Sequence, residues 1–311
     1  MRNLSSATQT ELKSGQDQLN PQSPLVKGIF EPRTSSIQYV VADPSTRRCA
    51  IIDPVLDFDE RSGSIGTQSA DELLTYVESV GLSVEWILDT HPHADHFSAI
   101  HYLSQKTGAK SGTGAKVTEV QTLWKGIYDL PDFRCGAHYW DHVFRAGDRF
   151  KIGELDVEVL HSPGHTLASI TYLAGNAAFI HDTLFMPDSG TARTDFPGGS
   201  ASALWQSIQS ILALPAQTRL FTGHDYQPGG RAVAWESSIA EQLTTNIHLQ
   251  NADEKSFIAQ RQARDRTLPM PKLLLHALQV NMQGGRLPAA VRGRSFLKIP
   301  INAFTHSTWP P

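Results

Sequence analysis

Four potential metal ligands lie close together in one short stretch of the chain, Thr90-His91-Pro92-His93-Ala94-Asp95-His96. Imidazole and carboxylate groups are good ligands for divalent metals such as zinc and iron. His91 and His93 are two residues apart, so at the end of a strand their side chains point to the same side. Asp95 and His96 follow where the chain turns toward a helix, and they can reach the same volume. The stretch therefore predicts part of a metal site.

Three further residues of ligand type follow at long intervals, each at the end of an apolar strand or just after one. His165 lies in the loop Ser162-Pro163-Gly164-His165-Thr166, where glycine lets the backbone approach closely. Asp182 ends the run Phe179-Ile180-His181-Asp182, and His224 ends the run Phe221-Thr222-Gly223-His224. Taken singly, each is equally well explained as a hydrogen-bonded residue at a strand end. Together with the first four, they predict a metal site at the edge of a sheet.

The elements that must position these residues alternate between strand-like and helix-like runs. Before the histidine motif, apolar and β-branched runs predict strands at residues 37–42, 49–53 and 84–89. A helix is predicted before the third strand, with Ser69 as N-cap, Glu72 as its capping-box partner and Gly81 at its end. After the motif, residues 97–106 are predicted to be helical.

The second half of the chain repeats the alternation. Strands are predicted at residues 149–152, 155–161, 169–174, 177–182 and 219–222, and helices at residues 201–214 and 233–246. Residues 110–145 are aromatic-rich and less regular, so we expect a helix and then a long loop that forms a lid or a dimer surface. Two strand-rich halves, each followed by helices, predict two packed sheets with helices outside.

The composition excludes several functions. The chain carries 27 basic and 31 acidic residues, a formal net charge of −4, and has no Lys/Arg run, so we expect no nucleic-acid partner. No stretch approaches the roughly 18 apolar residues of a membrane-spanning helix. The start lacks the apolar region of a secretory signal, so we expect a cytoplasmic protein without membrane contact. Cys49 and Cys135 imply no disulfide framework and no role in the chemistry.

Three parts are expected along the chain. Residues 1–24 predict a flexible N-terminal arm, residues 25–250 one catalytic domain, and residues 251–311 a C-terminal extension that packs on that domain. No internal repeat or low-complexity tract suggests another division.

The ordered set of ligands resembles the metallo-β-lactamase superfamily over roughly residues 28–248. The resemblance implies an α/β (α+β) fold, a four-layer αββα sandwich with the site at one edge of its two sheets. Most members use two metals and a bridging hydroxide to hydrolyse thioesters, lactams, lactones or phosphoesters. In such a site one metal is held by His91, His93 and His165, the other by Asp95, His96 and His224, and Asp182 bridges the two.

Finer motifs resemble the persulfide dioxygenase (sulfur dioxygenase) family, and in particular its longer bacterial members. These motifs are Arg193-Thr194-Asp195-Phe196, His224-Asp225-Tyr226, Leu268-Pro269-Met270-Pro271-Lys272 and Gln279-Val280-Asn281-Met282. The resemblance implies oxidation of glutathione persulfide by O₂ to sulfite and glutathione, at one Fe(II) per chain, and we expect a homodimer. The alternative is a hydrolase of glyoxalase II (glutathione thioesterase) or lactonase type with two zinc, iron or manganese ions.

Carried onto this chain, the family resemblance implies that the iron is held by His91, His165 and Asp182. Such a set of two histidines and one carboxylate leaves three positions open for sulfur and O₂. The remaining ligand-type residues then surround the iron as hydrogen-bonding groups: His93, Asp95, His96 and His224. Asp53 and Asp225 are further candidates for orienting the ligands.

The residues expected to act on the substrate are fewer. Asp95, His96 and Tyr226 are the candidate catalytic residues. Arg193 and Tyr226 are the candidates for holding the glutathione moiety, because a guanidinium binds a carboxylate through two hydrogen bonds and a phenol can donate one. For Arg193, an ion pair that supports its own loop is an equally good explanation.

Overall fold

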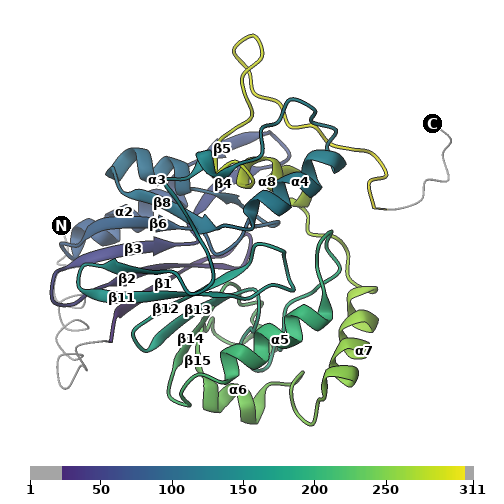
Figure 1. Ribbon diagram of the computed structural model, residues 1–311. Coiled ribbons are helices and arrows are strands. Elements are labelled where there is room, and N and C mark those ends of the chain that lie inside the picture. The colour runs from purple at the N-terminus through teal and green to yellow at the C-terminus, as the bar shows by residue number, and fades with distance from the viewer. Residues whose placement is uncertain (1–22, 305–311) are drawn as a thin grey trace.

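The computed structural model describes residues 23–304, so the predicted arm at residues 1–24 lies almost wholly outside the described residues. Two six-stranded sheets are stacked face to face, and helices cover the outer face of each sheet (Figure 1). This arrangement is the predicted four-layer αββα sandwich. The division into a catalytic domain and a C-terminal extension stays a prediction.

The first sheet has the strand order β1-β2-β3-β6-β8-β9. Its strands are β1 (Leu25–Glu31), β2 (Ser36–Ala42), β3 (Arg48–Ile52), β6 (Ser83–Leu88), β8 (Lys110–Gly114) and β9 (His142–Phe144). Strands β3 and β6 are parallel neighbours, with Ile52 opposite Leu88. Because parallel strands end at the same edge, Asp53 and the histidine motif emerge side by side.

The second sheet has the order β10-β11-β12-β13-β14-β15. Its strands are β10 (Arg149–Ile152), β11 (Leu155–His161), β12 (Ile170–Ala174), β13 (Ala177–His181), β14 (Arg219–Thr222) and β15 (Glu236–Ser238). All neighbours are antiparallel except β13 and β14. That one parallel pair brings Asp182 and His224, which follow the two strands, to the same edge.

The interior between the sheets is apolar because strand side chains alternate between two faces. In β2, Tyr39 and Val41 face the second sheet and belong to one buried cluster with Phe179 and Phe221. Val40 and Ala42 face the other way and belong to the cluster beneath the helices. Both faces of the strand are therefore buried, which explains its continuous apolar sequence.

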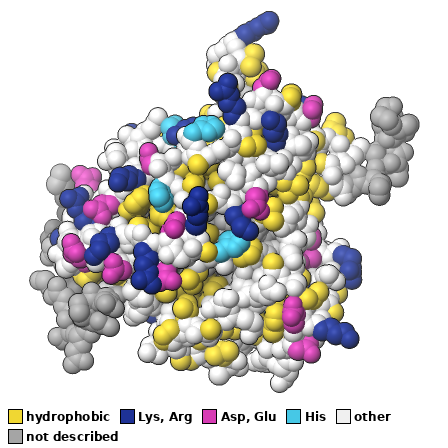
Figure 2. Space-filling view, viewed as in Figure 1, with side chains coloured by type: hydrophobic (Ala, Val, Ile, Leu, Met, Phe, Trp, Pro, Cys, Tyr) yellow, Lys and Arg dark blue, Asp and Glu magenta, His cyan; other side chains and the backbone are white. Residues whose placement is uncertain are grey.

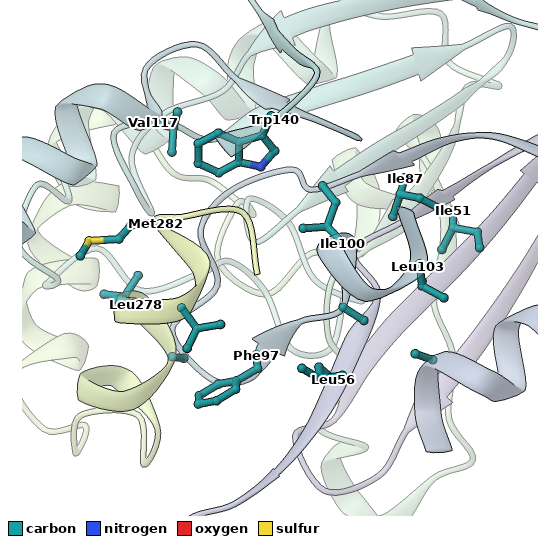
Figure 3. Close-up of a cluster of buried hydrophobic side chains, with 14 of the residues drawn as sticks. Ile51, Leu56, Ile87, Phe97, Ile100, Leu103, Val117, Trp140, Leu278 and Met282 are labelled. Carbon is teal, nitrogen blue, oxygen red and sulfur yellow. The ribbon is translucent and has the colours of Figure 1, made fainter. Parts of the chain in front are cut away.

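Helices form the two outer layers (Figure 1). The first sheet is covered by α2 (Gln68–Ser79), α3 (Ile100–Thr107), α4 (Val117–Ile127) and α8 (Leu274–Asn281), and the second by α5 (Ala201–Leu212), α6 (Ile239–Thr245) and α7 (Glu254–Asp265). Short 3₁₀ turns η1 (Ala137–Tyr139) and η2 (Pro228–Gly230) complete the helical elements of the described residues. Figure 3 shows Leu278 and Met282 of the C-terminal region packed in the same cluster as Phe97 and Val117.

A small third sheet, β5-β4-β7, was not predicted. It consists of β4 (Val55–Asp59), β5 (Ser64–Gly66) and β7 (Phe97–Ser98). The predicted helix at residues 97–106 therefore begins three residues later, after a strand. The N-cap of α2 is Thr67 rather than Ser69, because the Ser69 hydroxyl donates to Asp57 Oδ1 (2.6 Å) instead of closing a capping box.

Two other segments differ from prediction. Residues 233–246 are not one helix: β15 comes first, and α6 begins after Ser238, whose hydroxyl accepts from the Glu241 amide (3.2 Å). Residues 110–145 contain β8, α4 and β9, and Trp124, Tyr128 and Trp140 are buried in the core. No residue of this segment lines the pocket above the metal-ligand candidates, so the lid expectation is wrong. The dimer expectation remains a prediction.

Basic and acidic side chains are interspersed on the face seen in Figure 2. In the range 23–304, none of the helices combines the length and apolar character needed to cross a lipid bilayer.

Candidate metal centre

All seven predicted ligands meet at one edge of the sandwich. Six of them are buried: His91, His93, His96, His165, Asp182 and His224. Among the described residues, the possible ligand atoms of His91, His165 and Asp182 lie within 4.8 Å of one another. A second group with the same spacing consists of His93, Asp95 and His96. The ordered set read from the sequence is therefore one spatial cluster.

The first group presents unpaired atoms to its centre. His91 Nε2 and Asp182 Oδ1 are buried and have no hydrogen-bond partner among the described residues. His165 Nε2 lies 3.4 Å from Asp182 Oδ2. Buried polar atoms are nearly always paired, so unpaired ones that converge call for a missing partner. A divalent cation fits, because lone pairs and a carboxylate are what it binds.

The hydrogen bond on one nitrogen of each histidine fixes the lone pair on the other. Thr90 illustrates this: its hydroxyl donates to Asp53 Oδ2 (2.8 Å), so it accepts from His91 Nδ1 (3.0 Å) and leaves the His91 Nε2 lone pair free. His165 Nδ1 donates to the Arg193 carbonyl (2.9 Å), which leaves His165 Nε2 free. Both imidazoles are thus prepared as ligands.

The second group is oriented in the same way. His93 Nε2 donates to Asp53 Oδ1 (3.0 Å), and its Nδ1 is buried without a partner. His96 Nδ1 donates to the Phe97 carbonyl (3.0 Å). Asp53 also accepts from the Thr90 amide (2.7 Å), so this single carboxylate orients both His91 and His93. The expectation that Asp53 is an orienting residue agrees with this geometry.

His224 connects the two groups. Its Nε2 lies 3.4 Å from Asp95 Oδ2 and 3.4 Å from Asp182 Oδ2. Its Nδ1 lies 3.3 Å from the Ser35 carbonyl. Ser36, which no sequence pattern singles out, donates to Asp95 Oδ2 (3.2 Å). Asp95 and Asp182 are therefore held facing one imidazole.

The charges at the centre shift the pKa values of its groups. Burial lowers the pKa of His93, but the Asp53 carboxylate outweighs it and raises that pKa to about 9. Burial likewise lowers the pKa of His224, and Asp182 and Asp95 raise it to about 10. Burial raises the pKa of Asp182, but the imidazoles of His224, His165 and His91 outweigh it and hold that pKa well below the usual range. A cation held by His93 would have to displace a proton, so the metal affinity of the second ligand group should rise with pH.

Gly164 allows the loop of His165 to lie against α5. Its φ is +132°, a backbone conformation that other residues rarely adopt, and an added Cβ would overlap the backbone of Leu204. The Gly164 carbonyl accepts from the Ser200 amide (2.8 Å), just before α5. The position of His165 therefore depends on a close contact that only glycine permits.

Substituting alanine for Gly164 should push this loop away from α5. We expect a loss of about 3 kcal/mol in the free energy of unfolding, from overpacking and backbone strain, together with weaker metal retention. Gly126→Ala is the matched control, because Gly126 lies in α4 with open space around it, and its effect should be neutral or slightly stabilising. Thermal unfolding and metal analysis of both variants would measure this. Equal behaviour of the two variants would contradict the role given to Gly164.

Asn281 at the end of α8 holds the histidine motif from behind. Its Nδ2 donates to the carbonyls of His93 and His96 (2.7 Å each), and its Oδ1 accepts from the Ser98 amide (2.8 Å). The side chain is fully buried. The sequence identified this residue only as part of a family motif and indicated no contact, because the partners are more than 180 residues away in the chain.

The other predicted residues differ in placement. Tyr226 stacks on His224, with ring centroids 5.7 Å apart, and remains 58% exposed in the pocket. Arg193 forms two hydrogen bonds to Asp195 (2.7 and 2.8 Å) and a third to the Pro269 carbonyl (2.6 Å). This is the loop-supporting ion pair that was the alternative for Arg193. Asp225 is buried and accepts from Arg231, which stabilises the loop after β14.

A pocket of about 960 Å³ opens above the centre. Its floor includes Asp95, His96, His165, Asp182 and His224, and its walls come from the β4–β5 turn, α7 and the α7–α8 connection. A pocket of this size accepts a small molecule of peptide dimensions. Fold, ligand cluster and pocket together define a metal-dependent enzyme.

Comparison with known proteins specifies the family. Residues 33–224 match the model of the metallo-beta-lactamase superfamily, and the chain belongs to this superfamily. The "Beta-lactamase hydrolase-like protein" of Agrobacterium fabrum is 65% identical over 287 residues, which are 92% of this chain and 67% of that protein. "Glyoxylase B2" of Dictyostelium discoideum is 42% identical over 277 residues, 88% of this chain and 95% of that protein.

Likeness to the predicted finer family is more distant. "Persulfide dioxygenase ETHE1, mitochondrial" of Mus musculus is 28% identical over 264 residues, 84% of this chain and 89% of that protein. The crystal structure of ETHE1 from Myxococcus xanthus superimposes with a TM-score of 0.68 at 30% identity, and covers 84% of this chain and all of that one. The superfamily and its metal site are confirmed, whereas relatives of higher identity carry hydrolase or glyoxylase names.

Proposed function

We propose that this protein is a persulfide dioxygenase that oxidises glutathione persulfide to sulfite and glutathione at a single iron held by His91, His165 and Asp182. The observation that carries the proposal is the first ligand group, in which two imidazole lone pairs and one carboxylate converge. His91, His165 and Asp182 would hold the iron, and iron(II) there would supply the redox chemistry that combines a sulfur substrate with O₂. The overall likeness to ETHE1 of Myxococcus xanthus supports the same proposal.

The Arg193–Phe196 motif supports the proposal through its contact with a ligand. The Arg193 carbonyl accepts from His165 Nδ1, and the Arg193 side chain is fixed by Asp195 and Pro269. Phe196 packs edge-on against the His165 ring, with centroids 5.1 Å apart. In this proposal the motif orients His165 and shields it on one side, rather than binding glutathione.

The remaining polar residues position groups around the centre. His224 faces both Asp95 and Asp182, so it holds the two carboxylates in fixed orientations. His96 and Asp95 line the pocket floor, where they can hydrogen-bond a substrate. Tyr226 lines the same pocket, and its phenol can donate a hydrogen bond to a substrate.

The second candidate function is hydrolysis of a glutathione thioester or a lactone at two metals. The second ligand group, His93, Asp95 and His96, favours it, as do the names of the Agrobacterium and Dictyostelium relatives. The fold and the pocket are compatible with both functions, so the number and identity of the metals decide between them.

One experiment separates the two functions. Protein purified anaerobically and loaded with iron should consume O₂ when glutathione persulfide is added, and should contain about one iron per chain. Without glutathione persulfide, or with glutathione alone, no uptake is expected. Elemental analysis after purification without added metal gives the stoichiometry. About two metals per chain, with thioester hydrolysis and no O₂ uptake, would replace this proposal with the hydrolase.

A further inference from the structure

The pocket above the metal centre is lined by several cations, and most of them already have partners. Arg33 pairs with Glu31 and Asp57, Arg193 with Asp195, Arg261 with Asp265, and Lys272 with Glu60. Cations in such pairs attract an anionic ligand only weakly, because a protein carboxylate already neutralises each guanidinium or ammonium. The pocket-lining cations that remain are Arg61 and Arg264.

Arg264 on α7 has no carboxylate partner among the described residues. Its Nη1 lies 3.0 Å from His248 Nε2, an imidazole whose burial lowers its pKa to about 4, so that this neighbour is neutral. Arg264 is exposed and lines the pocket. Most of its N–H donors are therefore available to a molecule that enters the pocket.

Arg61 comes from a different part of the chain, the turn between β4 and β5. Within the described residues, its guanidinium takes part in no hydrogen bond or salt bridge; its backbone amide donates to Asp59 (3.1 Å), and its charge acts at longer range on the same carboxylate. Asp59 in turn accepts from Ser62 (2.7 Å), so its carboxylate is partly satisfied within the turn. Arg61 is exposed and also lines the pocket.

We infer that Arg264, assisted by Arg61, binds the carboxylates of the thiol compound that carries the substrate sulfur. A guanidinium binds a carboxylate through two parallel N–H donors, which makes it selective for this group. The inference rests on the proposed function and identifies the substrate class as a thiol with two carboxylates, as in glutathione. Arg193, the residue first expected to do this, already directs three N–H groups to Asp195 and Pro269.

Binding of S-methylglutathione to the metal-loaded protein tests the inference without any turnover. Calorimetry should give at least about 10-fold weaker binding for Arg264→Gln, the loss expected for a charge-assisted hydrogen bond. Arg61→Gln should weaken binding less. Arg266→Gln is the matched control, because Arg266 is an exposed arginine one residue beyond α7 that does not line the pocket. Unchanged binding in Arg264→Gln, or an equal loss in Arg266→Gln, would overturn the inference.

The diethyl ester of S-methylglutathione, which lacks both carboxylates, provides the second arm. The wild-type protein should bind the ester more weakly than the acid, and Arg264→Gln should bind it as the wild type does, because the lost partner is the carboxylate. If Arg264→Gln weakens the binding of the ester and of the acid equally, Arg264 does not bind a carboxylate. This inference and the proposed function fail separately. If Arg264→Gln loses binding of S-methylglutathione but the wild type shows no O₂ uptake, the role of Arg264 is upheld and the dioxygenase function is rejected.

Discussion

Replacing His165 by alanine is expected to remove the bound metal and to abolish activity. His165 supplies one of three converging ligand atoms, with its Nε2 lone pair fixed by the bond from Nδ1 to the Arg193 carbonyl. Changes to residues that only support ligands cost about 10- to 100-fold in metal affinity or activity, and loss of a ligand should exceed this range. Elemental analysis and the O₂-uptake rate of the purified variant measure both effects.

His96→Ala separates the two proposed metal arrangements. With a single iron, this variant should lose about 10- to 100-fold in activity but keep its metal, because His96 belongs to the other ligand group. With two metals, it should keep about half of the metal of the wild type. His138→Ala, which changes an exposed histidine in η1, is the control and should match the wild type. Equal metal loss in His165→Ala and His96→Ala would contradict the single-iron assignment.

Asn281→Ala is expected to destabilise the protein and to loosen the metal site at the same time. The substitution leaves the Ser98 amide and the carbonyls of His93 and His96 without their buried partner. Each such group costs about 1–3 kcal/mol, so we expect a loss of at least about 3 kcal/mol in the free energy of unfolding. Metal affinity should fall by about 10- to 100-fold, because the backbone of the histidine motif is no longer held.

Two further variants show whether the amide of Asn281 is the cause. Asn281→Asp keeps the acceptor for Ser98 but places a carboxylate against two carbonyls, so it should be at least as damaging as alanine. Gln283→Ala alters a nearby side chain whose one hydrogen bond within residues 23–304 goes to the Gln279 carbonyl (2.7 Å), and it should cost less than about 1 kcal/mol. Denaturant unfolding and competition with a chelator would measure stability and metal affinity. A wild-type profile for Asn281→Asp would rule out the donor role.

The contacts that the C-terminal residues make with the site could not be predicted from sequence patterns. Residues 251–311 were expected to pack on the catalytic domain, and within the described part α7 contributes Arg264 to the pocket and α8 contributes Asn281 to the histidine motif. Neither contact could be predicted from the hydrophobic periodicity or the motif spacing of the sequence. The sequence of residues 110–145 predicts a long loop for a related reason: β8 has the sequence Lys-Ser-Gly-Thr-Gly and acquires its strand conformation only from its neighbours β6 and β9.

The sequence by itself determined the fold class and the order of strands, and it predicted the candidate ligand set from His91 to His224. It could do so because ligand chemistry, strand alternation and the turn into a helix are local properties of neighbouring residues. Only the tertiary structure decided which nitrogen of each histidine is free, since that depends on partners such as Asp53 and the Arg193 carbonyl, which lie elsewhere in the chain. It also decided which arginines of the pocket lack a carboxylate partner among the described residues, because the partner that neutralises a charge is set by packing rather than by spacing.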